Sequence, residues 1–243
     1  MLVDSHYHLG QCRVFDLDMT EQDVLEPHDA EGFDVTLVQP YPGAPDPVAT
    51  HDRIAALAAS SEGRVRGFAS YNPHRDPAEY FAEVSRCVRD LGFVGIKLHT
   101  IGHALNPLSV DGGTVFEAAR ELDVPVMLHT GPGIPFADPA MVIPRAKQFP
   151  DVRIILGHAG WSIFTGSAIA VVETFDNIYL ETSWCKSSDL AGMVGRVGAR
   201  RVMYGSDHPK NVVPELAKYR SAGLSQEDLD LVLGDTAAEV FRL

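Results

Sequence analysis

The chain has 243 residues, of which 45% are hydrophobic and 22% are charged, and this length suits one domain with a large core. A formal net charge of −13 disfavours nucleic acid as a partner, and no apolar run reaches the twenty or so residues of a membrane span. Three separated cysteines, Cys12, Cys87 and Cys185, match no zinc motif built on paired cysteines. The N-terminus has no secretory signal pattern, so a cytoplasmic location is expected.

Short apolar runs rich in β-branched residues recur along the chain and predict strands. There are eight of them: Leu2–His6, Phe33–Gln39, Arg64–Tyr71, Phe93–His99, Val124–His129, Arg153–His158, Asn177–Glu181 and Arg201–Gly205. Amphipathic stretches between them predict helices at Glu21–Glu31, Thr50–Ser61, Pro77–Leu91, Thr114–Leu122, Pro139–Phe149, Ile163–Phe175 and Ser188–Val197, with a closing pair across Val213–Arg242. The proline-rich segment Pro40–Pro47 predicts a stiff rim loop.

This alternation predicts an α/β fold, specifically a single (β/α)8 TIM barrel that occupies residues 1–243 as one domain. An open doubly wound sheet fits less well, because it has fewer strands and usually places a glycine-rich turn after the first. Here the first strand leads into His6, Tyr7 and His8 instead. In a barrel of this kind the functional site lies at the C-terminal ends of the strands.

Residues that bind metals or move protons occur at several predicted strand ends. His6 and His8 are two apart on an extended segment, so both imidazoles point to one side. His129 and His158 end two later strands, and Asp207 follows the last one. A single strand-terminal histidine is more often a structural residue, but the joint pattern favours a metal centre at the mouth of the barrel.

Imidazole nitrogens and a carboxylate suit a divalent ion, with zinc expected first and manganese second. A catalytic centre of this type keeps one coordination position for water, whose pKa the metal lowers to about 7. Asp207 is placed to accept the proton of that water and to pass it on. The chain is therefore expected to be a metal-dependent enzyme.

Five segments together resemble the amidohydrolase superfamily, in particular the amidohydrolase-related group that includes aminocarboxymuconate-semialdehyde decarboxylase. They are Asp4–His8, Gly95–His99, His129–Gly131, Gly157–Gly160 and Gly205–Pro209, and the final Gly234–Leu243 resembles the last helix of the family. The resemblance implies that His6, His8, His129 and Asp207 ligate the metal. It also implies that His158 binds a second metal or acts as an acid or base, so that His158 and Asp207 are the expected catalytic residues.

Lys97 has two interpretations, because binuclear members of the superfamily carry a carboxylated lysine at the end of the fourth strand. A carbamate on Lys97 would bridge two ions, whereas an unmodified lysine would leave one ion and either offer its charge to a substrate carboxylate or pair with a nearby acid inside the barrel mouth. His99 is expected to face the same pocket. The other rim candidates are Tyr41, Tyr71, Asn72, His103, Trp161, Glu181 and Trp184, while His28, His51 and His74 are expected at the surface.

The leading functional prediction is hydrolysis of an amide, lactone or ester-type bond in a small molecule by metal-activated water. The alternative is non-oxidative decarboxylation of a small unsaturated or aromatic acid, with Lys97, Lys210 or Arg13 as the cation that orients the carboxylate. A scaffold protein without activity is disfavoured by the intact ligand set, and a nuclease by the negative charge. The short rim loops suggest either an open pocket or a homo-oligomer in which a neighbouring subunit completes the pocket.

Overall fold

The computed structural model describes all residues from 1 to 243. The strands are β1 (Val3–Cys12), β2 (Leu17–Met19), β3 (Val35–Pro40), β4 (Val65–Ala69), β5 (Gly95–Leu98), β6 (Val126–His129), β7 (Ile154–Gly157), β8 (Ile178–Glu181) and β9 (Val202–Met203). The α-helices are α1 (Glu21–Glu31), α2 (Pro47–Ser60), α3 (Pro77–Arg89), α4 (Val110–Leu122), α5 (Ile143–Gln148), α6 (Thr165–Thr174), α7 (Ser187–Val197), α8 (Val212–Arg220), α9 (Gln226–Asp230) and α10 (Thr236–Phe241). Short 3₁₀ turns and one π-helical segment, η6 (Leu231–Asp235), complete the chain.

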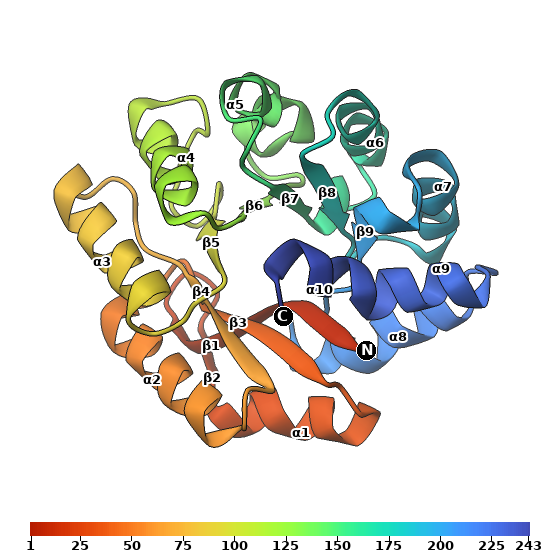
Figure 1. Ribbon diagram of the computed structural model, residues 1–243, viewed down its shortest axis with the longest axis horizontal. Coiled ribbons are helices and arrows are strands. Elements are labelled where there is room, and N and C mark those ends of the chain that lie inside the picture. The colour runs from red at the N-terminus through yellow and green to blue at the C-terminus, as the bar shows by residue number, and fades with distance from the viewer.

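All nine strands form one sheet in the order β2-β1-β3-β4-β5-β6-β7-β8-β9. Only β2 is antiparallel, and every other neighbouring pair is parallel. Helices connect the parallel strands and surround them in Figure 1, so most strand residues are buried on both faces of the sheet. This arrangement explains why the strands are continuous apolar runs in the sequence, and it confirms the predicted α/β class.

The sheet curls until the strands from the two ends of the chain meet. The backbone N–H of Ser5 in β1 donates to the carbonyl of Tyr204, just after β9, at 3.2 Å. A second bond runs from the N–H of Asp207 to the carbonyl of His6 at 2.7 Å. Residues about 200 positions apart are thereby held side by side, and both His6 and Asp207 belong to the predicted metal site.

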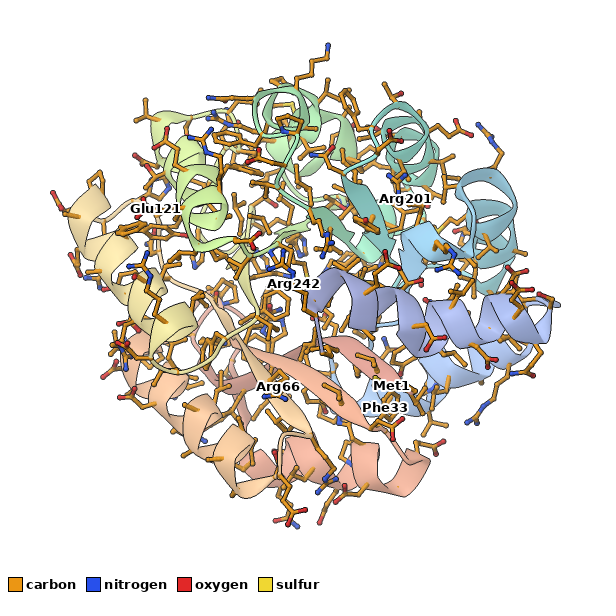
Figure 2. The ribbon with its side chains drawn as sticks, in the orientation of Figure 1. Met1, Phe33, Arg66, Glu121, Arg201 and Arg242 are labelled. Atoms are coloured by element: carbon orange, nitrogen blue, oxygen red, sulfur yellow. The ribbon has the colours of Figure 1, made fainter.

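The C-terminal helix covers the end of the sheet at which the parallel strands begin. A separate apolar cluster joins side chains from the strands to those of α10: Val3, Leu37, Phe68, Met127, Ile155, Met203, Ala237, Val240 and Phe241. Figure 2 shows Arg242 near the middle of this face, where its guanidinium pairs with the carboxylate of Asp123 at 2.7 Å. The C-terminal strand ends therefore lie at the opposite end of the curled sheet.

Several predicted boundaries need correction. Strand β2 was not predicted, because three residues paired to the end of β1 give no clear periodicity. The predicted closing pair of helices is three elements, α8, α9 and α10, with η6 between the last two. Pro40 ends β3 and Pro47 begins α2, so the rim loop is shorter than expected. No helix combines the length and the hydropathy that a membrane crossing requires.

Candidate active site

The middle of β1, which continues to Cys12 rather than ending at His6 as predicted, presents two histidines to the carboxylate that follows β9. His6 Nε2 lies 3.2 Å from Asp207 Oδ1, and His8 Nε2 lies 3.1 Å from the same oxygen. One ligand atom from each of these three residues lies within 4.8 Å of the other two. The structure therefore brings together three of the four residues that were expected to ligate a metal.

The orientation of His6 is set by a buried glutamate at the end of β8. His6 Nδ1 donates to Glu181 Oε2 at 2.6 Å, which leaves Nε2 facing the cluster. Glu181 also accepts the backbone N–H groups of His158, at 3.1 Å, and Ser183, at 2.5 Å. Burial opposes ionisation of Glu181, but the adjacent His6 lowers its pKa to about 2. Glu181, which the sequence placed at the rim or behind the residues that line the pocket, therefore supports His6 from behind.

His129 and His158 lie together on the ends of β6 and β7. His158 Nε2 is 3.1 Å from His129 Nδ1, and His158 Nδ1 is 2.7 Å from Ser183 Oγ. His129 does not share a group with His6, His8 and Asp207 in which all donor atoms lie within 4.8 Å. Its Nε2, however, is buried without any hydrogen-bond partner, as is His8 Nδ1. Buried polar atoms without a partner are rare and are expected where a ligand binds.

The protonation states of the residues at this site suit the binding of a cation. Burial lowers the pKa of His8 to about 4 and that of His158 to about 3, and it places the pKa of His129 well below its usual range. Burial would raise the pKa of Asp207, but the nearby His6 and the hydrogen bond with His8 hold it well below its usual value. Imidazole nitrogens around one carboxylate are a donor set that fits a divalent metal ion.

Lys97 reaches this cluster from β5. Its side chain is 1% exposed, and its Nζ lies 2.8 Å from His6 Nε2. Burial lowers the pKa of Lys97 to about 8, with Asp207 and Glu181 opposing that shift. The structure places Lys97 beside the cluster of His6, His8 and Asp207, where a metal-bridging carbamate and a lysine that binds substrate would both have to lie. The other two cations considered for substrate binding, Arg13 and Lys210, are exposed.

His99 also lies in the pocket region, as expected. Its ring stacks on that of His129 with centroids 4.2 Å apart, and its Nδ1 accepts the backbone N–H of Gly102 at 2.9 Å. Burial holds the pKa of His99 well below its usual range. His99 therefore packs beside a predicted ligand, and its orientation is fixed by the loop after β5.

A buried aspartate that sequence reasoning passed over connects β1 to the segment after β9. Asp4 accepts the backbone N–H of His6 at 3.1 Å and that of Ser206 at 3.0 Å, and it also bonds to the hydroxyl of Ser206. The Nε2 atom of His28, which was expected at the surface, lies 2.8 Å from Asp4. A carboxylate on the same strand, two positions before His6, was the available signal.

His51, the second histidine expected at the surface, is also buried. Its Nδ1 lies 2.7 Å from Glu83 Oε1, and its Nε2 accepts the backbone N–H of Ser70 at 3.0 Å. Both ring nitrogens therefore have hydrogen-bond partners within the protein, and His51 links α2 to α3 and to the end of β4. His74 is exposed, as expected.

Several backbone positions at the site adopt a left-handed conformation that is uncommon for residues other than glycine. The φ angles are 66° at His158, 53° at Trp161, 65° at Trp184 and 66° at Asp207. Conformations of this kind persist only where the surrounding structure enforces them, and they cluster at functional sites. The strain lies at the C-terminal ends of β7, β8 and β9.

Neutral histidines and a carboxylate at the C-terminal ends of parallel strands define a metal-dependent α/β enzyme. The chain belongs to the amidohydrolase family, whose family model matches residues 18–243. It is 25% identical to a gamma-resorcylate decarboxylase from Rhodococcus jostii, over 96% of this chain and 90% of that protein.

Two solved structures share the fold over the whole chain. The 5-carboxyvanillate decarboxylase of Sphingomonas paucimobilis has a TM-score of 0.79 at 18% identity, covering 100% of this chain and 99% of the other. The dihydroxybenzoic acid decarboxylase of Polaromonas sp. JS666, solved with manganese and 2-nitroresorcinol, has a TM-score of 0.75 at 20% identity, covering 100% and 97%.

The leading prediction from the sequence, hydrolysis of an amide, lactone or ester-type bond, is wrong. These relatives, which match the chain over nearly its full length, are decarboxylases. Sequence reasoning favoured hydrolysis because that reaction requires only a metal, a coordination position for water and a proton acceptor. The same residues also serve decarboxylation, so the ligand set alone does not separate the two reactions.

Proposed function

We propose that the protein is a metal-dependent, non-oxidative decarboxylase of a small aromatic acid. The observation that carries this proposal is the cluster of His6, His8 and Asp207 in a chain whose full-length relatives are decarboxylases. We further propose that the curled sheet is a closed (β/α)8 barrel forming one domain over residues 1–243. The backbone bonds between β1 and the segment after β9 support closure.

His6, His8, His129 and Asp207 would hold the cation. Three of them already face one another, and the unpartnered Nε2 of buried His129 supports the fourth. The bound metal would supply positive charge that polarises an oxygen of the substrate. Imidazole ligands favour zinc, whereas the carboxylate and the manganese in the Polaromonas structure favour manganese, which we propose to test first.

The reaction replaces a carbon–carboxylate bond with a carbon–hydrogen bond, so one proton must reach the ring carbon as carbon dioxide leaves. Asp207 and His158 are the groups proposed to hold that proton. Asp207 is ionised and His158 is neutral, so each is able to accept a proton from the acidic substrate and return it to carbon. His158 follows β7 and Asp207 follows β9, the two strands that flank β8, and both residues lie beside the proposed ligands.

Lys97 is the proposed partner of the substrate carboxylate. Among the cations considered, it alone is buried at the cluster, because Arg13 and Lys210 are exposed. A carbamate on Lys97 that bridges two ions is the competing proposal. The 2.8 Å contact between Lys97 Nζ and His6 Nε2 is short enough for Lys97 to serve in either way.

The activity is tested with the manganese-loaded protein and a small panel of substrates. We expect release of carbon dioxide from 2,6-dihydroxybenzoate or 5-carboxyvanillate, with loss of about two orders of magnitude or more in kcat for Asp207→Asn. The exposed His74→Ala is the matched control and should retain activity. Failure of metal-loaded protein to decarboxylate any hydroxylated benzoate would contradict the proposal.

Metal analysis separates the two proposals for Lys97. One equivalent per chain, lost in His6→Ala and kept in Lys97→Ala, supports an unmodified lysine. Two equivalents that fall to one or none in Lys97→Ala support the carbamate. Protein that takes up neither manganese nor zinc would contradict a metal centre altogether.

A further inference from the structure

Both tryptophans of the chain lie beside the candidate active site. Trp161 follows β7 and Trp184 follows β8, and their ring centroids are 6.0 Å apart with the planes inclined by 32°. The Trp161 ring centroid is also 5.7 Å from that of His158. Each tryptophan is 38% exposed, so the pair presents aromatic surface to solvent next to buried histidines.

Trp184 is joined directly to the metal-ligand cluster. Its indole N–H donates to Asp207 Oδ2 at 2.8 Å, while Asp207 Oδ1 faces His6 and His8. The side chain of Asp207 is 22% exposed, whereas those of His6 and His8 are almost fully buried. Trp184 therefore contacts the one member of the cluster that is partly exposed.

Hydrogen bonds join the two loops that carry the tryptophans. The backbone N–H of Lys186 donates to Ser162 Oγ at 2.9 Å, and Cys185 Sγ donates to the carbonyl of His158 at 3.1 Å. The backbone N–H of Trp184 is held by buried Glu215 at 2.8 Å. Such bonds fix the position of the indole rings before any ligand arrives.

The backbone around Trp161 is shaped to admit this side chain. A Cβ atom on Gly131 would lie 3.2 Å from Trp161 Cβ, and Gly131 has a φ of 146°. Only glycine accepts that conformation readily and also leaves room for so close an approach. Trp161 and Trp184 themselves have left-handed φ angles, which are unusual for bulky residues. Several independent features thus keep two large rings in place at the mouth of the site.

We propose that Trp161 and Trp184 form a binding surface for the planar aromatic ring of the substrate. Stacked rings need about 3.5 Å per interface, so a separation of 6.0 Å leaves no room for a ring between the two indoles. The substrate ring instead packs against their shared exposed surface, with its carboxylate directed toward Lys97 and the cation. In this inference the direction of the carboxylate rests on the proposed function, whereas the position of the ring rests on the geometry of the two tryptophans.

Two ligands with the same charge but different rings test the inference. The probes are 2,6-dihydroxybenzoate, which is flat and aromatic, and cyclohexanecarboxylate, which is neither. Binding to manganese-loaded protein is measured by calorimetry and by intrinsic tryptophan fluorescence, whose only sources are these two residues. The variants are Trp161→Leu, which removes the aromatic face, and Trp161→Phe, which keeps one.

We expect 2,6-dihydroxybenzoate to quench the fluorescence and to bind about tenfold more weakly to Trp161→Leu, with most of the affinity restored in Trp161→Phe. The affinity for cyclohexanecarboxylate should stay within about twofold. Equal weakening for both acids, unchanged affinity for both, or binding of neither acid to the wild type would overturn the inference. Matching thermal unfolding of the variants and the wild type confirms that the fold is intact.

The outcomes also separate this inference from the proposed function. If binding of 2,6-dihydroxybenzoate depends on the tryptophans but no aromatic acid releases carbon dioxide, the ring-binding surface is supported and the decarboxylase is contradicted. If the wild type releases carbon dioxide and Trp161→Leu binds 2,6-dihydroxybenzoate as tightly as the wild type does, the decarboxylase is supported and the ring-binding surface is overturned.

Discussion

His6 donates from Nδ1 to Glu181 at 2.6 Å, and this contact decides which of its nitrogens faces the cluster. A histidine has two inequivalent nitrogens, and a hydrogen bond from one of them directs the lone pair of the other. Glu181 is itself held by the backbone N–H groups of His158 and Ser183. A residue that touches neither metal nor substrate is thus expected to control metal affinity.

The substitution Glu181→Gln tests this relationship. The amide keeps the size of the side chain but removes its negative charge, so His6 becomes a weaker ligand. We expect manganese affinity to fall by about 10- to 100-fold, measured by competition with a chelator of known affinity. The exposed Glu121→Gln is the control, and equal affinities for the two variants would refute the assigned role.

Asp4 should matter for stability more than for chemistry. Asp4→Ala leaves the backbone N–H groups of His6 and Ser206 and the ring of His28 without their buried acceptor. We expect the free energy of unfolding to fall by about 3–5 kcal/mol in urea titrations. Ser206→Ala removes one hydroxyl and should cost about 1 kcal/mol. A loss for Asp4→Ala no larger than that would contradict this account.

Two glycines should respond to alanine in opposite directions. A Cβ atom on Gly95 in β5 would lie 2.4 Å from the ring of Phe68, so Gly95→Ala overpacks the core and should destabilise by about 1–3 kcal/mol. Gly192 lies exposed within α7 with no atom within 4 Å of such a Cβ. Gly192→Ala should stabilise by about 0.5–1 kcal/mol. Thermal unfolding of both variants checks the signs, and a shared sign would be inconsistent with the packing.

Acid should weaken the contact between α2 and α3. Burial opposes ionisation of Glu83, but hydrogen bonds from His51 and Arg86 lower its pKa from the ordinary 4.5 to about 2. Because the pKa is lower in the folded state, Glu83 stabilises the fold fully above pH 4.5 and loses that contribution as the pH falls toward 2. Glu83→Gln should flatten the pH dependence of stability in this window. An unchanged slope would argue against the pairing.

The strand ends of the site were predictable because their signals are local. His6 and His8 show strand alternation directly, and His129, His158 and Asp207 each follow a buried apolar run. The curled parallel sheet brings such ends together whatever the lengths of the helices between them. Convergence of His6, His8 and Asp207 thus followed from fold class and position alone.

The supporting residues were harder to predict, because their partners are distant in the chain. Glu181 meets His6 across 175 positions, and Asp4 meets Ser206 across 202. His28 and His51 lie on predicted helices, where a histidine is usually exposed, yet both are buried and each is paired with a carboxylate, Asp4 or Glu83. Pairings of this kind depend on side-chain packing in three dimensions, which periodicity does not encode.

The bond between Asp207 and His6 has a consequence for how the protein is made. During synthesis the first histidines emerge from the ribosome long before the carboxylate they face, and Tyr204 comes 199 positions after its partner Ser5. The proposed ion site therefore stays incomplete in the nascent chain until the segment that carries Asp207 has been translated. Capture of the metal then reports that the first and last strands have met, and it would favour chains that have finished folding.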